Sequence, residues 1–125
     1  MQAQSQSIEM TVYGEPASKA NSRRAVRIGG RSMFIKSKKA LEYSKGFVEQ
    51  TKDLGYEPFA EDVAVTMHIW YASRRPDLDE SLILDLLQGV AYLNDRQVKE
   101  RHTYWHLDKE NPRCTIEVKK IGQAF

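Results

Sequence analysis

Three aspartates near the middle of this 125-residue chain are the side chains best suited to chemistry. Asp77 and Asp79 stand two positions apart, and Asp95 follows later in an Asn94-Asp95 pair. Alternate side chains of an extended segment point the same way, so Asp77 and Asp79 can face one point, to which Asp95 can return. Carboxylates suit Mg²⁺, an ion that neutralises a scissile phosphate and activates water. The spacing therefore predicts a metal site for phosphodiester hydrolysis.

The same aspartates also fit a purely structural role. Asp77 or Asp79 can cap the helix that is expected to follow, and Glu80 stands in the capping-box position relative to Asp77. The Asn94-Asp95 pair is equally suited to a turn. On spacing alone, the metal site and the caps and turns stay open as alternatives.

The first third of the chain is strongly basic. Between residues 17 and 52, ten basic side chains stand against two acidic ones, a net charge of +8, which leaves −6 for the rest of a chain whose total is +2. This asymmetry suits a protein that binds a polyanion with one part and places carboxylates near it with another, although solvated surface charge is the alternative. Five cations are predicted to contact DNA phosphates. They are Lys19, Arg23, Arg24, Arg74 and Arg75.

Hydrophobic periodicity and turn residues predict the elements that must position these side chains. Ser37 is a suitable N-cap for a first helix, and Gly89 is a suitable end for a second. Together the elements predict an α+β fold, a single domain over residues 1–125 with a mixed β-sheet and two main helices. Strands are expected over 8–13, 63–71, 98–107 and 114–121, a basic hairpin around Gly29-Gly30 over 25–35, and helices from 38 to about 53 and from about 80 to 88.

Each expected helix has a recognisable face. The second helix is apolar except at Ser81, Asp85 and Gln88, which recur at helical spacing and form one polar stripe. If this stripe lies beside the three aspartates, Asp85 borders the metal site. The buried side of the first helix is expected at Leu41, Val48, Tyr43, Phe47 and Leu54.

Composition is that of an ordinary globular protein. Hydrophobic content of 41% and charged content of 29% are typical, and the short apolar runs cannot span a bilayer. The start of the chain is polar and uncharged, unlike a signal or transit peptide, so a cytoplasmic location is expected. Cys114 is the single cysteine, which excludes an internal disulfide and a cysteine zinc site.

Several motifs, in order along the chain, resemble the RusA family of crossover-junction endodeoxyribonucleases, which is common in phages and prophages. The match covers most of the chain and is strongest between Arg74 and Val98. Motifs in the right order are far more specific than an isolated Asp-x-Asp. The matching segments are Gly14-Glu15-Pro16 with Ser18-Lys19, Arg75-Pro76-Asp77-Leu78-Asp79, Leu84-Asp85-Leu86-Leu87, Gln88-Gly89-Val90 and Asn94-Asp95-Arg96-Gln97-Val98.

The resemblance implies a RusA-like fold and a homodimer that binds a four-way DNA junction, the Holliday junction. It implies two symmetric nicks in opposed strands, made with magnesium, and it assigns the catalytic and metal-binding carboxylates to Asp77, Asp79 and Asp95. Two symmetric nicks require two symmetric active sites, which a homodimer supplies. A junction-binding protein with little cleavage, and a nuclease for other branched DNA, are the alternatives.

Two positions depart from the pattern of the family. Glu80 stands where an asparagine is usual, and it either adds a metal ligand or faces solvent at the start of the helix. The family has a lysine in this helix, which falls at Ile83 when counted forward from Asp79 and at Ser81 when counted back from Asp85. Neither residue is basic, so either another cation replaces the lysine or the site is altered. The candidate replacements are Lys19, Lys36, Lys38 and Lys39.

Overall fold

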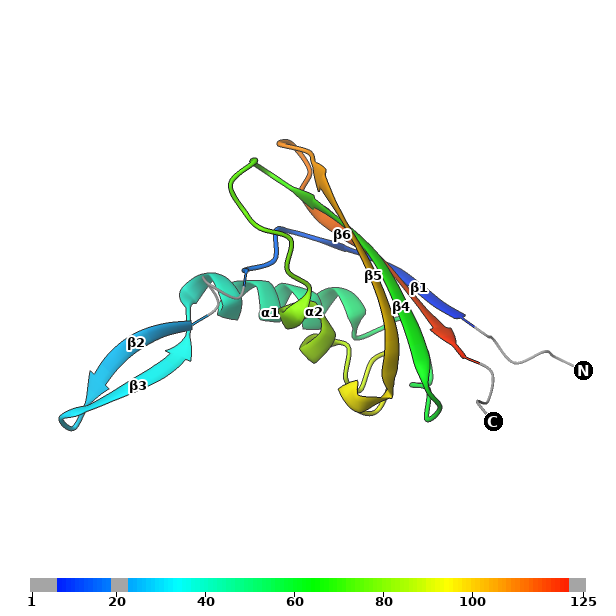
Figure 1. Ribbon diagram of the computed structural model, residues 1–125, viewed down its shortest axis with the longest axis horizontal. Coiled ribbons are helices and arrows are strands. Elements are labelled where there is room, and N and C mark those ends of the chain that lie inside the picture. The colour runs from blue at the N-terminus through cyan, green and yellow to red at the C-terminus, as the bar shows by residue number, and fades with distance from the viewer. Residues whose placement is uncertain (1–6, 19–22, 122–125) are drawn as a thin grey trace, which may run out of the picture.

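A computed structural model of the chain describes residues 7–18 and 23–121. Four strands form one sheet in the order β1-β6-β4-β5, and two more form a separate hairpin (Figure 1). The predicted α+β fold with a mixed sheet and two main helices is confirmed. The elements are β1 (Ser7–Tyr13), β2 (Arg23–Ile28), β3 (Arg31–Lys36), α1 (Lys38–Thr51), β4 (Val63–Tyr71), α2 (Ser81–Leu86), the 3₁₀-helix η2 (Asp95–Gln97), β5 (Val98–Leu107) and β6 (Arg113–Lys120).

The connection between β4 and β5 decides where the aspartates lie. These strands run parallel, with Val63 opposite Val98 and Tyr71 opposite Leu107. Parallel neighbours cannot be joined by a tight turn, so the chain must cross from the end of one strand to the start of the next. α2 forms part of this crossover, on the face of the sheet that α1 also covers (Figure 1). The segment after β4 therefore lies at one end of the strand pair, and the segment before β5 lies at the other.

The core lies between the sheet and the two helices. Alternate side chains of β4, from Val63 to Tyr71, are at most 1% exposed and face the helices. The intervening side chains are half-buried on the opposite face, which no helix covers in the described part of the chain (Figure 1). Among residues 7–18 and 23–121, no helix is long and apolar enough to cross a membrane.

Helix α1 buries Tyr43 and Phe47 as predicted, but not the other three side chains of the predicted stripe. Ser37 caps it as predicted, because its hydroxyl accepts a hydrogen bond from the Ala40 N–H at 3.2 Å. Leu41, Val48 and Leu54 are 49%, 58% and 41% exposed, so their predicted burial is wrong. Positions three or four residues apart share a helix face, and the aromatic side chains select which face is buried. The buried stripe consists of Ala40, Tyr43, Phe47 and Thr51.

The basic hairpin is confirmed and extends away from the sheet (Figure 1). Its turn contains Gly29 and Gly30 at φ angles of 59° and 81°, which glycine adopts without steric cost. Its arginines Arg24, Arg27 and Arg31 are exposed. The hairpin thus presents positive charge away from the core.

Rings line the open face of the sheet. His68 Nδ1 and His106 Nε2 are 2.8 Å apart, and His106 stacks on Trp70 with ring centroids 4.6 Å apart. His68 also stacks on Tyr104, and the Arg113 guanidinium lies 4.2 Å from the Trp70 ring centroid. These rings cover one another on β4 and β5, on the face of the sheet that none of the described helices covers.

Acid should weaken the fold through His106. Burial, followed by repulsion from His68 and Arg113, lowers the pKa of His106 below its usual 6.5. The unfolded chain therefore takes up this proton first, so stability present above about pH 6.5 is lost as the pH falls through the lowered value. Urea denaturation at about pH 7.5 and about pH 5 measures the free energy of unfolding, which should fall less on acidification in His106→Gln than in the wild type. The exposed His102 on the same strand supplies the control, His102→Gln, and an equal effect there would contradict this assignment.

Candidate active site

Two stacked aromatic side chains hold the Asp-x-Asp segment against the sheet. Trp105 Nε1 donates to the Pro76 carbonyl at 3.0 Å, and the Asp79 N–H donates to the Tyr71 hydroxyl at 3.2 Å. The rings of Tyr71 and Trp105 have centroids 5.8 Å apart. The loop after β4 is thus anchored at both ends of the motif, while the Asp77 side chain between them is exposed.

Asp79 has the structural role that its spacing also allowed. Its Oδ1 accepts a hydrogen bond from the Ser81 N–H at 2.9 Å, at the first turn of α2. Glu80 does not face solvent freely, because Thr103 Oγ1 on β5 donates to its Oε2 at 3.1 Å. Glu80 is thereby held at the junction between α2 and the sheet.

The turn that carries Asp95 is fixed by its neighbours. Asn94 caps η2 by accepting from the Arg96 N–H at 2.9 Å, and the Gln97 side chain accepts from the Asn94 N–H at 2.8 Å, so a capping box is present. The Gln97 amide also donates to the Phe59 carbonyl at 2.7 Å. The Asp95 carboxylate forms no hydrogen bond or ion pair with the described residues, so it remains available to a ligand.

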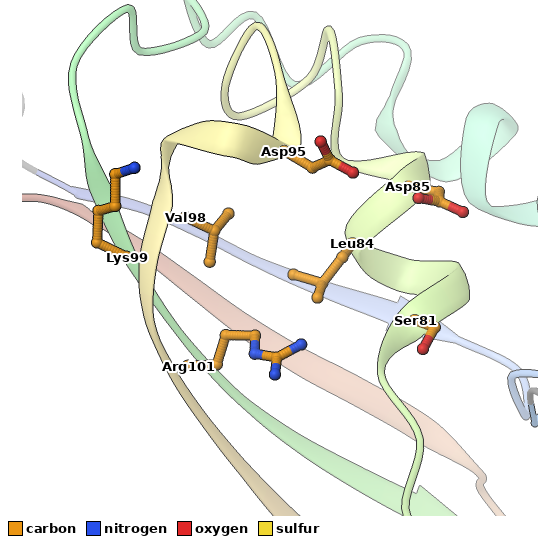
Figure 2. Close-up of a pocket in the computed structure, with 7 residues that line it drawn as sticks. All are labelled: Ser81, Leu84, Asp85, Asp95, Val98, Lys99 and Arg101. Carbon is orange, nitrogen blue, oxygen red and sulfur yellow. The ribbon is translucent and has the colours of Figure 1, made fainter.

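A pocket of about 480 Å³ lies between α2 and the start of β5. Figure 2 shows the Asp95 carboxylate projecting toward the end of α2, where Asp85 lies. From β5, the Arg101 guanidinium extends toward Ser81 at the start of that helix (Figure 2). Acidic and basic side chains therefore share one open pocket. Its lining consists of Ser81, Leu84, Asp85, Asp95, Val98, Lys99 and Arg101.

The buried tyrosine Tyr92 lies within electrostatic range of both Asp85 and Asp95. Burial raises the pKa of its hydroxyl, and the negative charges of Asp95 and Asp85 raise it further. The hydroxyl keeps its proton and donates it to the Leu84 carbonyl at 2.6 Å. Tyr92 thus anchors the chain after α2 to the helix, beside both acidic side chains.

The three predicted aspartates do not meet within this chain. Asp77 and Asp79 precede α2, whereas Asp95 follows it, because the helix crosses from one end of the parallel strand pair to the other. Within the described residues, no three His, Cys, Asp or Glu side chains could together hold a metal ion. Asp85 is the acidic side chain that the pocket places with Asp95.

One family model matches most of the chain, including the residues that line this pocket. The family model described as Endodeoxyribonuclease RusA matches residues 14–119. The chain belongs to the RusA endodeoxyribonuclease family. The match spans both acidic segments and the pocket between them, so the resemblance predicted from the motifs is confirmed. No curated protein matches the chain.

Three of the five predicted DNA-binding cations of this RusA-family chain have side chains that the structure describes. Lys19 lies outside the described residues, and so does the side chain of Arg23. Arg24 is exposed on β2, and Arg74 and Arg75 are exposed in the loop after β4. The two loop arginines directly precede the segment that carries Asp77 and Asp79.

Lys36, Lys38 and Lys39, three of the expected substitutes for the helical lysine of the family, do not line the pocket, and the fourth, Lys19, lies outside the described residues. Lys39 Nζ is bound to Glu15 at 2.7 Å, and Lys38 lies 4.0 Å from Glu42 on the outside of α1. The cations that line the pocket are Lys99 and Arg101, which sequence analysis missed. Alternation along the strand over 98–107 is the signal that could have placed Arg101 on the face toward α2.

Glu15, from the family-matching Gly14-Glu15-Pro16 segment, ties α1 to the start of the active-site loop. Its two carboxylate oxygens accept hydrogen bonds from Lys39 Nζ and from the Ala72 N–H, each at 2.7 Å. Burial acts to raise the pKa of Glu15, but the bonds to Lys39 and Ala72 outweigh it, so the net pKa is below the usual 4.5. The ionised form is therefore favoured in the folded chain.

Replacing this carboxylate should destabilise the fold at neutral pH. We expect Glu15→Gln to cost about 1–3 kcal/mol of unfolding free energy, the usual loss for a charged hydrogen-bond partner. The stabilisation is present above the usual pKa of 4.5 and is lost as the pH falls through the lowered value, so the two proteins should converge in acid. Urea denaturation at neutral and acidic pH measures both effects. A loss that stays constant with pH would contradict the role of the charge.

Proposed function

We propose that residues 1–125 form a single magnesium-dependent endonuclease domain that resolves four-way DNA junctions in the cytoplasm by paired symmetric nicks, as a homodimer. Membership of the RusA endodeoxyribonuclease family supports the endonuclease activity. The observation that carries the proposal is the open pocket between α2 and β5, where the carboxylates of Asp85 and Asp95 lie with the Arg101 guanidinium. Carboxylates and a cation around one space suit a phosphodiester.

The acidic side chains fit magnesium in their chemistry. Asp77, Asp79 and Asp95 are the proposed ligands, although the described residues do not gather them around one point; each offers the hard oxygen atoms that Mg²⁺ prefers. Asp77 and Asp95 are exposed, and within the described residues their carboxylates form no hydrogen bond or ion pair. When bound, Mg²⁺ would supply charge neutralisation at the scissile phosphate and activation of water. Asp85 adds a second carboxylate beside Asp95.

The positive charge of the protruding hairpin supports binding to the DNA backbone. Arg24, Arg27 and Arg31 are exposed there, and Arg74 and Arg75 are exposed beside the Asp-x-Asp segment. Phosphate contacts fix the position of a protein on DNA without reading its sequence. Recognition of junction shape through such contacts requires no base-specific side chains.

Neutralising the hairpin should weaken DNA binding in a salt-dependent way. In the double variant Arg27→Gln with Arg31→Gln, we expect the slope of log affinity against log salt to fall by about 1 for each phosphate contact removed. Fluorescence anisotropy with a labelled four-way junction measures this slope. Lys109→Gln, in the exposed turn between β5 and β6, is the control for loss of charge alone. An unchanged slope in the double variant would show that Arg27 and Arg31 do not contact DNA phosphates.

Cleavage itself tests the proposal. Purified protein is incubated with a four-way junction and with linear duplex of the same sequence, first in a magnesium titration and then with a chelator. We expect nicking of the junction that rises with magnesium, stops with the chelator and spares the duplex. Binding without nicking would support the second candidate, a junction-binding protein, which the separation of Asp77 and Asp79 from Asp95 favours. Equal nicking of replication forks or flaps would support a broader branched-DNA nuclease.

A further inference from the structure

We propose that Arg101 binds a DNA phosphate in the pocket between α2 and β5 and supplies the positive charge that α2 itself lacks. This inference rests on the proposed nuclease function. It assigns a substrate-contacting role to a residue outside both acidic motifs. Three features of the structure carry it: the face of β5 on which Arg101 lies, the freedom of its guanidinium, and the other side chains around the pocket.

The pleat of β5 fixes the direction of Arg101. Successive side chains of a strand point to opposite faces, so residues two apart share a face. Thr103 and Trp105 reach the loop and helix side of the sheet, where they bond to Glu80 and to the Pro76 carbonyl. Arg101 precedes them in the same alternation and lines the pocket with Asp85 and Asp95.

The guanidinium of Arg101 is available for a ligand. Among the residues that the structure describes, it forms neither a hydrogen bond nor an ion pair. Arg113 is different, because its guanidinium is held by the Asp108 carboxylate and the Asn111 carbonyl, each at 2.9 Å. A free guanidinium presents five donors in a planar fork that matches two phosphate oxygens.

No other cation in the described lining is aimed into the pocket. α2 contributes Ser81, Leu84 and Asp85 to the lining, none of them basic, and Ile83 is fully buried. Lys99 also lines the pocket, but Figure 2 shows its side chain on the other side of the β5 ribbon from Asp85 and Asp95. Two carboxylates without a nearby cation would repel a phosphate, so the Arg101 charge makes phosphate entry electrostatically feasible.

The test compares Arg101→Gln with Lys99→Gln, which removes the same charge from the same strand. Binding to a labelled four-way junction is measured over a range of salt in a chelator, so that no cleavage intervenes. We expect Arg101→Gln to lower the salt slope by about 1 and Lys99→Gln to lower it less. With magnesium and saturating enzyme, we expect Arg101→Gln to cleave about 10²–10³-fold more slowly, as when a preorganised contact to a transition state is removed.

The conservative variant separates charge from geometry. Arg101→Lys keeps the charge but loses the fork, so we expect it to restore the salt slope and only part of the cleavage rate. Equal melting temperatures of all variants would exclude unfolding as the cause. Arg101→Gln with the wild-type slope and rate, or with losses equal to those of Lys99→Gln, would overturn the inference. If the wild type cleaves no DNA, the nuclease proposal fails, and the salt slope alone decides the phosphate contact of Arg101.

Discussion

Asp95→Asn should abolish most cleavage while leaving junction binding intact. We expect its single-turnover rate to fall by at least about 10²–10³-fold, because a charged group acting on the transition state is lost. The change is nearly isosteric and spares the backbone N–H of Asp95, which donates to Gln88 Oε1 at 3.1 Å. Within the described residues its carboxylate forms no hydrogen bond or ion pair, so the turn should keep its structure. Removing a negative charge should, if anything, tighten binding to DNA.

Matched variants show whether this loss is specific to the site. Asp77→Asn and Asp79→Asn should behave like Asp95→Asn if all three are metal ligands. Asp85→Asn measures the contribution of the carboxylate that shares the pocket with Asp95. The exposed Asp62, directly before β4 and outside the pocket lining, supplies the control Asp62→Asn. Full cleavage by Asp95→Asn would remove Asp95 from the catalytic site.

Ile83→Lys should unfold a large part of the population, whereas Ser81→Lys should not. Counting along the chain allowed either position for the helical lysine of the family, but the two positions differ in burial. Ile83 is fully buried, while Ser81 is exposed and lines the pocket. A buried charge without a partner costs about 3–5 kcal/mol, a large share of the stability of a small domain.

Chemical denaturation measures both lysine variants under the same conditions. We expect Ser81→Lys to stay close to the wild type, because its new ammonium group lies in an open pocket beside Asp85. The Ser81 N–H would still donate to Asp79, so the first turn of α2 is kept. Equal stability of the two lysine variants would contradict the placement of α2 against the sheet.

The sequence was sufficient for the elements that have a strong local signal. Alternation identified the four strands of the sheet, and Gly29-Gly30 and Ser37 identified the hairpin and the start of α1. The burial of α1 was predicted less well, because Leu41 and Val48 are as apolar as the residues that are actually buried. Of the five residues predicted to be buried, only the aromatic pair Tyr43 and Phe47 lies in the core, a selection made by packing rather than by periodicity.

The candidate site was harder to predict from the sequence, because its geometry depends on which strands pair and in which direction. Strands read from alternation carry no information on whether β4 and β5 run parallel. Their parallel pairing places Asp79 and Asp95 at opposite ends of α2, which spacing along the chain could not reveal. It also places Arg101 in the pocket, while Lys39, a candidate from the sequence, is bound to Glu15. The pairing of strands far apart in the sequence therefore determines which acidic and basic side chains lie together, and the local sequence pattern does not.

Strand-resolved mapping of nicks on a four-way junction is the most direct test of the central claim. Each of the four DNA strands is labelled in turn, the junction is incubated with the protein and magnesium, and the products are sized to the nucleotide. We predict nicks at corresponding positions in two opposed strands of the same junction, which disappear in Asp95→Asn. Tight binding with all four strands intact, or nicks in a single strand, would contradict a resolving endonuclease.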